Sequence, residues 1–259
     1  MTPPPSLTEA DARTLIRLLG EVAAIERGYA AQKSALMDGV CKIIDADCWA
    51  WALACHYTTR AQPIYVGINH GGFTEERYAR LLLAVEHPDI PAMSIGIMEE
   101  YNKQRAHITR LHREMDRDNL FESSKAFPLW IAAGIRHLAM SIRPVDEIAD
   151  SVTVVYRRPD QPPFNPRDTR ILHIVLSEVP WLHAQGWPED RGVTVPSLTQ
   201  RQRLTLNLLL EGQSRKQIAH HLNLSTHTVS DYVKAIYSHF GVQSHAELMN
   251  RFRLGDGGD

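Results

Sequence analysis

The chain has 259 residues, of which 44% are hydrophobic and 22% are charged, and its formal net charge is −2 at pH 7. This length suits two modest domains, and the composition is that of a globular protein, which argues against disorder over most of the chain. The near-neutral charge excludes a protein that coats nucleic acid through a uniformly basic surface, so any charge that binds DNA must be concentrated locally.

The N-terminal segment and the cysteines predict a cytoplasmic protein. The opening stretch, MTPPPSLTEADART, has neither the basic nor the apolar region of a signal peptide. No apolar run is long enough to span a bilayer, so we expect no membrane association. Cys41, Cys48 and Cys55 are odd in number and lack the spacing of zinc ligands. We interpret them as buried thiols in a reducing compartment, and we expect no metal site and no cofactor.

Apolar periodicity predicts a mixed N-terminal domain over residues 1–186. The predicted helices are 8–27, with Thr8 as its N-cap, then 31–44, 74–86, 97–117 and 167–184, and the predicted strands are 48–56, 64–68, 136–143 and 151–158. This order of helices and strands favours an α+β domain over a βαβ repeat. The stretch 187–196 combines Pro, Gly and charge without a period, so we expect a linker there and a second domain over 197–259.

Capping signals divide the second domain into four helices. Capping boxes pair Thr199 with Gln202, Ser214 with Gln217 and Ser244 with Glu247, while Ser225 is the predicted N-cap of a helix over 226–240, and Gly212 and Gly241 are predicted stops. We therefore predict an all-α, four-helix domain.

The middle two helices form the pattern of a helix-turn-helix. A short helix over 215–222, a tight connection at 223–225 and a longer helix over 226–240 have the geometry that places a second helix in the major groove. Its predicted apolar face comprises Val229, Val233, Ile236 and Phe240. The polar residues that we expect at the DNA are Arg215, Lys216, Thr226, His227, Thr228, Ser230, Asp231 and Lys234.

The same segment resembles the LuxR/GerE-type helix-turn-helix domain. The shared pattern includes Leu198-Thr199, Glu211-Gly212, Ser214, Lys216, Ile218-Ala219, Leu224-Ser225, Thr228-Val229, Lys234, Ile236 and Gly241-Val242. The resemblance implies a transcription regulator that binds double-stranded DNA, with Lys216 on phosphate, Ser230, Asp231 and Lys234 toward the groove, and the last helix in a homodimer. RNA polymerase is a further candidate partner.

The segment also departs from that family pattern. Gln200 and Gln202 stand where the family usually has a proline and an acid, Ser230 stands where it often has a basic residue, and acidic Asp231 follows. Because phosphate neutralisation dominates nonspecific affinity, this thin basic charge predicts weak binding by a monomer and favours a dimer on two half-sites.

Residues 118–184 resemble the end of a GAF-like sensor domain. The resembling features are Trp130, the run Gly134-Ile135-Arg136-His137 and the run from Phe164 to Asp168. Such a domain implies either a small-molecule effector or a dimerisation role. Trp49, Trp51, Tyr65 and Trp130 are the candidate lining of a ligand pocket, and ordinary core packing is the alternative for them.

Other functional classes fit the sequence less well. A phosphoacceptor receiver needs paired acids at the end of its first strand, whereas Asp45 and Asp47 precede the first predicted strand. His107 and His112 fall in a charged predicted helix, on different faces, and we interpret them as surface residues. No catalytic motif is present, so we expect no enzyme. A protein-interaction module that does not itself bind DNA stays open as the alternative function.

Overall fold

The computed structural model describes residues 7–56, 64–85, 87–90, 94–116, 118–147, 149–185 and 198–253. The predicted linker at 187–196 lies outside these residues. The chain divides into two compact units. The first comprises Met1–Ala52, Ile68–Pro144 and Ser151–Gly186, and the second comprises Leu53–Gly67, Val145–Asp150 and Trp187–Asp259.

Five strands form one sheet in the order β2-β1-β5-β4-β3. Their bounds are β1 Cys48–Cys55, β2 Ile64–Gly71, β3 Ile108–Leu111, β4 His137–Pro144 and β5 Ala149–Arg157. The four strands expected from alternating apolar residues are therefore confirmed, and β3 is an addition. β3 pairs antiparallel with β4, with Ile108 opposite Ile142 and Leu111 opposite Ala139.

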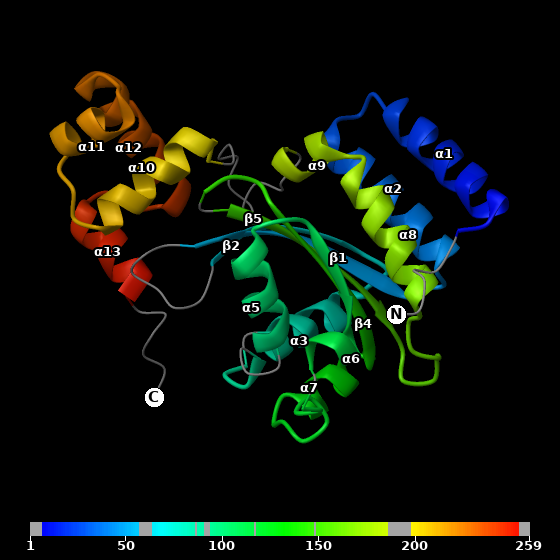
Figure 1. The fold of residues 1–259 in the computed structure, drawn as a ribbon. Coiled ribbons are helices and arrows are strands. Elements are labelled where there is room, and N and C mark those ends of the chain that lie inside the picture. Colours follow the sequence, from blue (N-terminus) through cyan, green and yellow to red (C-terminus); the bar gives the residue numbers. More distant parts are fainter. Residues whose placement is uncertain are drawn as a thin grey trace. The chain divides into compact units, whose positions relative to one another are not determined.

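Helices cover both faces of this sheet (Figure 1). On one face lie α1 Glu9–Ala23, α2 Tyr29–Ile43, α8 Pro166–Ser177 and α9 Pro180–Ala184, and on the other lie α3 Glu75–Val85, α5 Ile95–Gln104, α6 His112–Met115 and α7 Phe127–Ala132. The strands alternate their side chains between these two faces. The expectation of a mixed domain of helices and sheet is thus confirmed.

The face under α3, α5 and α7 is filled by an apolar core. Its buried members include Leu81, Tyr101, Phe121, Trp130 and Tyr156. The aromatic rings meet edge to face, with Phe121 and Trp130 centroids 5.7 Å apart. Rings in this arrangement pack well and add to the energy of burial.

Two of the predicted helices are wrong, because neither stretch forms one continuous helix. The predicted helix 97–117 is instead α5, β3 and α6, because Arg105 adopts a left-handed conformation (φ 46°) that ends α5 and the chain then pairs with β4. The predicted helix 167–184 is α8 followed by α9, because Pro180 has no backbone N–H to continue α8 and instead opens the next helix.

The correction at 97–117 also changes two histidines. His107 precedes β3 and is hydrogen-bonded to Ser141 and Ser177, and His112 packs edge to face on Phe121 with ring centroids 4.4 Å apart. The interpretation of both as residues of a surface helix is therefore wrong.

The C-terminal helices are α10 Gln200–Leu210, α11 Arg215–Leu222, α12 Thr226–Phe240 and α13 His245–Arg253, drawn from yellow to red in Figure 1. The predicted caps at Thr199, Ser214 and Ser225 are confirmed, whereas the predicted box at Ser244 is only half formed, because Glu247 accepts from the backbone N–H of Gln243 and from Ser244 Oγ instead of the Ser244 backbone. Thr199 and Ser214 each accept from the third residue on, and the side chains of Gln202 and Gln217 accept in return from the cap backbone. Gly212 and Gly241 both have positive φ. Within the described part of the chain, no helix has the length and apolarity that crossing a membrane requires.

Candidate nucleic-acid interface

A tight connection joins α11 to α12. Asn223 follows α11 in the left-handed conformation (φ 53°), and the backbone N–H of Leu224 donates to the carbonyl of Ala219 at 2.8 Å. Ser225 then caps α12 by accepting from the N–H of Thr228 at 3.0 Å. The reversal takes place within three residues, which fixes the start of α12 relative to α11.

Burial divides α12 into two faces. Val229, Val233 and Ile236 are at most 1% exposed and pack toward α10 and α11. The opposite face carries His227, Asp231 and Lys234, whose side chains are 88%, 52% and 80% exposed. Because α10 and α11 hold the apolar face, the polar face is presented to solvent, as a recognition helix requires.

Polar and charged side chains on that face lie close to one another. His227 Nδ1 lies 3.2 Å from Asp231 Oδ2, and Lys234 Nζ lies 3.6 Å from Asp231 Oδ1. These residues are three and four positions apart, so they share one side of the helix. Exposed pairs of this kind contribute little to stability.

Two hydroxyl groups of the predicted interface, those of Ser230 and Thr228, are hydrogen-bonded within the domain. Ser230 Oγ donates to the carbonyl of Thr226 at 2.9 Å, and Thr228 Oγ1 lies 2.8 Å from Ser225 Oγ. Thr226 itself is exposed at the first position of the helix, where the free backbone N–H groups and the helix dipole favour phosphate.

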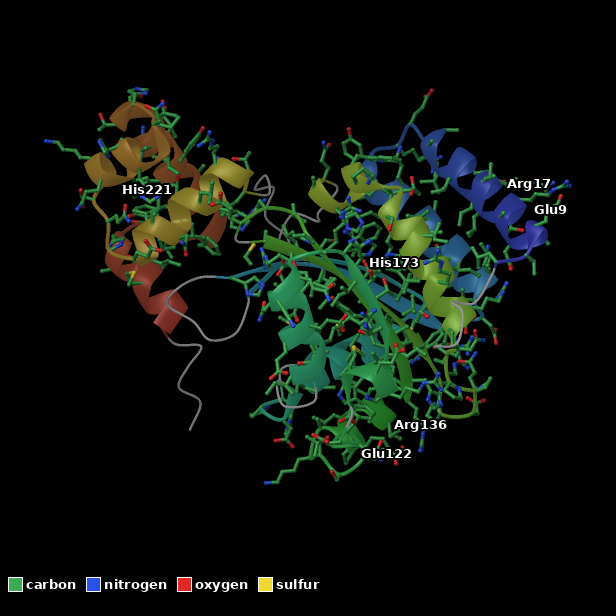
Figure 2. All side chains as sticks on the ribbon, viewed as in Figure 1. Glu9, Arg17, Glu122, Arg136, His173 and His221 are labelled. Atoms are coloured by element: carbon green, nitrogen blue, oxygen red, sulfur yellow. The ribbon has the colours of Figure 1, made fainter. Side chains whose placement is uncertain are left out.

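Helix α11 supplies two further cations. Arg215 and Lys216 are exposed in its first turn, and His221, labelled in Figure 2, is exposed further along. Arg203 is different, because it is 6% exposed and donates to the carbonyl of Leu198 at 2.9 Å. The structure therefore brings Arg215 and Lys216 to the surface and removes Arg203 from the charge available to DNA.

The comparisons with known proteins identify this part of the chain. Residues 196–252 match the family described as "Bacterial regulatory proteins, luxR family". These residues are a luxR-family domain. The presence of this domain supports the assignment of the chain as a DNA-binding transcription regulator. No curated protein matches the sequence significantly.

Three solved structures resemble this chain distantly, two of them over more than 90% of it. SdiA of Escherichia coli has 15% identity over 92% of this chain and 94% of its own, with a TM-score of 0.45. SdiA in complex with octanoyl-rac-glycerol has 14% identity over 95% of each chain, with a TM-score of 0.47. CepR2 of Burkholderia cenocepacia, an N-acylhomoserine lactone dependent LuxR family transcription factor, has 13% identity over 66% of this chain and 92% of its own, with a TM-score of 0.42.

The four aromatic residues predicted to line a pocket lie in different surroundings. Trp49 and Trp51 are buried on β1, where their indole nitrogens donate to Asp38 and Ser151. Trp130 is buried in the core under α3, α5 and α7, and Tyr65 is 48% exposed on β2. A surface groove of about 750 Å³ lies beside α5, β3 and α6, and its lining is charged and includes none of the four.

A buried polar network lies between α8, α9 and the sheet. His183 Nδ1 lies 2.7 Å from Ser151 Oγ and its Nε2 lies 2.8 Å from the carbonyl of Leu176. His173, labelled in Figure 2, stacks on His107 with centroids 4.3 Å apart. Burial lowers the pKa of His107 and of His183 to about 3 and also lowers that of His173. These histidines are therefore neutral at physiological pH.

The sequence analysis placed Asn223 in the tight connection but did not predict its backbone conformation. Asn223 ends α11 in the left-handed conformation, which it adopts more readily than other non-glycine residues because its short amide bonds locally. An asparagine just after the last apolar residue of a helix is the signal that predicts such an end. Among the residues described, no cluster of three histidines, cysteines or acids has the arrangement of a metal site.

Proposed function

We propose that this chain is a transcription regulator that places α12 in the major groove of double-stranded DNA. The observation that carries this proposal is the exposed polar face of α12, held outward by the capped turn from α11 inside a luxR-family domain. Arg215 and Lys216 lie at the phosphate backbone, together with Thr226 and Thr228. His227, Ser230, Asp231 and Lys234 face the base edges.

The regulator acts as a homodimer on two half-sites. Within residues 198–249, exposed basic charge is thin, so one domain neutralises few phosphates and binds weakly. Two linked domains raise the effective concentration of the second and restore affinity. Any change in the distance between the two recognition helices then alters binding, because the half-sites have a fixed spacing on the duplex.

Residues 1–186 control this spacing in response to a signal. The assignment of this part as a GAF-like sensor stays a prediction, as do a small-molecule effector, RNA polymerase as a partner and a cytoplasmic location. A ligand site at Trp49, Trp51, Tyr65 and Trp130 also stays a prediction, and the separation of Trp130 from Trp51 lends it no support.

Fluorescence anisotropy with duplex DNA from upstream of the gene tests the proposal. Lys216→Ala and Lys234→Ala each remove a cation from the interface, so each should weaken binding and lower the slope of affinity against salt by about one unit. Lys42→Ala removes an exposed lysine of α2 and serves as the matched control. If both interface variants bind as the wild type does, α12 does not lie in the groove.

The thin basic charge favours one second candidate, a domain that pairs proteins without binding DNA itself. The two functions differ in their response to salt. Binding to DNA falls steeply as salt rises because counterions are released from the phosphates, whereas a mainly apolar protein interface is nearly insensitive. A salt titration of binding therefore separates them.

A further inference from the structure

The exposed face of α12 centres on a carboxylate. Asp231 is the acidic residue of Thr226–Phe240, all of which the structure describes, and its side chain is 52% exposed. His227 lies 3.2 Å away on one side, and Lys234 lies 3.6 Å away on the other. An acid at this position is unexpected in a DNA interface, because phosphates repel it.

A carboxylate in the major groove distinguishes the four bases. An ionised carboxylate only accepts hydrogen bonds. Guanine offers acceptors at N7 and O6, thymine offers the acceptor O4, and adenine offers a donor at N6 beside an acceptor at N7. Cytosine offers the donor at N4, so it is the base that meets a carboxylate without presenting an acceptor of its own.

We propose that Asp231 is a specificity-determining residue that accepts a hydrogen bond from the N4 amino group of a cytosine in each half-site. This inference rests on the proposed function, since it needs α12 in the major groove. The neighbouring Lys234 offsets the charge of the carboxylate, and His227 Nδ1 lies 3.2 Å from it, so both residues help it to approach the DNA. The hydrogen bond to cytosine then compensates for the remaining repulsion.

The same carboxylate acts against wrong sequences. Where guanine or thymine lies opposite Asp231, the carboxylate meets base acceptors and gains no hydrogen bond that compensates for its repulsion by the phosphates. Asp231 therefore lowers affinity for nonspecific DNA more than for the cognate site. Replacing it with a neutral residue should raise general affinity while reducing discrimination.

Selection of bound duplexes from a random-sequence pool tests the inference with the full chain and with Asp231→Asn. Asparagine has nearly the same shape, and Asp231 is exposed, so the variant should fold normally. We expect the wild type to enrich cytosine about tenfold at one position of each half-site. In the variant that preference should disappear or change to adenine, whose N6 and N7 match an amide, while other positions keep their bases.

Glu211→Gln is the matched control. Glu211 is an exposed acid of the same domain at the end of α10, so this change removes the same charge away from the recognition helix. We expect it to select the wild-type sequence, and we expect Asp231→Asn, unlike Glu211→Gln, to bind a random duplex about threefold more tightly.

The outcomes separate the inference from the proposed function. If Asp231→Asn selects the same half-site as the wild type at every position, the role of Asp231 is overturned and the proposal of DNA binding stands. A wild-type chain that selects no sequence and binds no duplex overturns the proposed function, and the inference falls with it.

Discussion

Arg157 on β5 reaches Asp168 on α8, with Arg157 Nη2 lying 3.3 Å from Asp168 Oδ2 and both side chains almost completely buried. The same guanidinium donates to the carbonyls of Ile44 and Asp45, at the end of α2, and to the carbonyls of Pro162 and Pro163. A planar group with five donors suits this set of acceptors, and it joins one strand, two helices and a loop.

We predict that Arg157→Lys lowers the free energy of unfolding by about 3 kcal/mol. An ammonium group cannot reach every acceptor that the guanidinium serves, so buried carbonyls lose their partners. Urea denaturation of the full chain, followed by circular dichroism, measures the change. Arg13→Lys, at an exposed pair with Glu9, is the control and should change stability by less than about 0.5 kcal/mol. If both variants changed the free energy of unfolding by the same amount, Arg157 would not join these elements as proposed.

Gly72 and Gly20 should respond to alanine in opposite directions. Gly72 has φ +79°, and a Cβ there would lie 2.4 Å from the carbonyl oxygen of Asp47 and 2.8 Å from Cys48 Cα. Since both neighbours are backbone, we expect Gly72→Ala to destabilise the protein by at least about 2 kcal/mol. Gly20 lies in α1 with nothing within 4 Å, so Gly20→Ala should stabilise by about 0.5–1 kcal/mol. Thermal unfolding of both variants decides the point, and a shift of the same sign in both would contradict it.

The C-terminal domain was predictable from sequence because its signals are local. A cap such as Ser225 or a stop such as Gly241 acts within one turn of its own helix, and the structure bears out both. Their positions therefore locate α10 to α13 without knowledge of the rest of the chain. The left-handed conformation of Asn223, which was not predicted, also depends on local interactions.

The N-terminal domain was less predictable because its decisive contacts are distant in sequence. Tyr101, Ile108, Leu111 and Met115 have helical spacing, yet Ile108 and Leu111 are buried because β3 pairs with β4, about thirty residues later. His183 looks like an ordinary polar residue in the sequence. In the structure it is buried and hydrogen-bonded to Ser151, which the fold brings to it from another element.

His183 should make stability depend on pH. Burial lowers its pKa from 6.5 to about 3 in the folded protein. The basic groups Arg143 and Lys33 add to this effect, and the hydrogen bond to Leu176 opposes it. As pH falls below 6.5 the unfolded chain takes up a proton that the folded protein excludes, so stability is complete above 6.5 and is lost progressively toward pH 3. At pH 5 the loss from this residue is about 2 kcal/mol.

Urea denaturation at pH 7 and pH 5 measures this effect. His183→Gln has no imidazole to titrate, so its stability should fall about 2 kcal/mol less than that of the wild type between these two pH values. For each protein the change in the free energy of unfolding between pH 7 and pH 5 is compared. The hydrogen bonds that His183→Gln loses lower its stability at both pH values, so their contribution cancels in this change. His221→Gln, at an exposed histidine, should follow the wild type. A wild type and a His183→Gln variant with the same dependence on pH would refute the role of this histidine.

Ser225 should couple the stability of the luxR-family domain to DNA binding. Its Oγ accepts from the N–H of Thr228 at 3.0 Å and fixes the first turn of α12. Ser225→Ala should therefore destabilise the domain by about 1 kcal/mol and weaken DNA binding through fraying of that turn. Ser225→Asp keeps an acceptor and should retain stability, but its charge near the phosphates should still weaken binding.

Denaturation and anisotropy on the same preparations separate these effects. Ser238→Ala, at an exposed serine further along α12, is the control and should alter neither quantity. Ser225→Asp retains the cap and adds a negative charge. In this variant the stability of the domain should therefore stay unchanged while its affinity for DNA falls. If Ser225→Asp bound DNA as tightly as the wild type, the start of α12 would not lie near the phosphate backbone, and the docking proposed for this helix would have to be reversed.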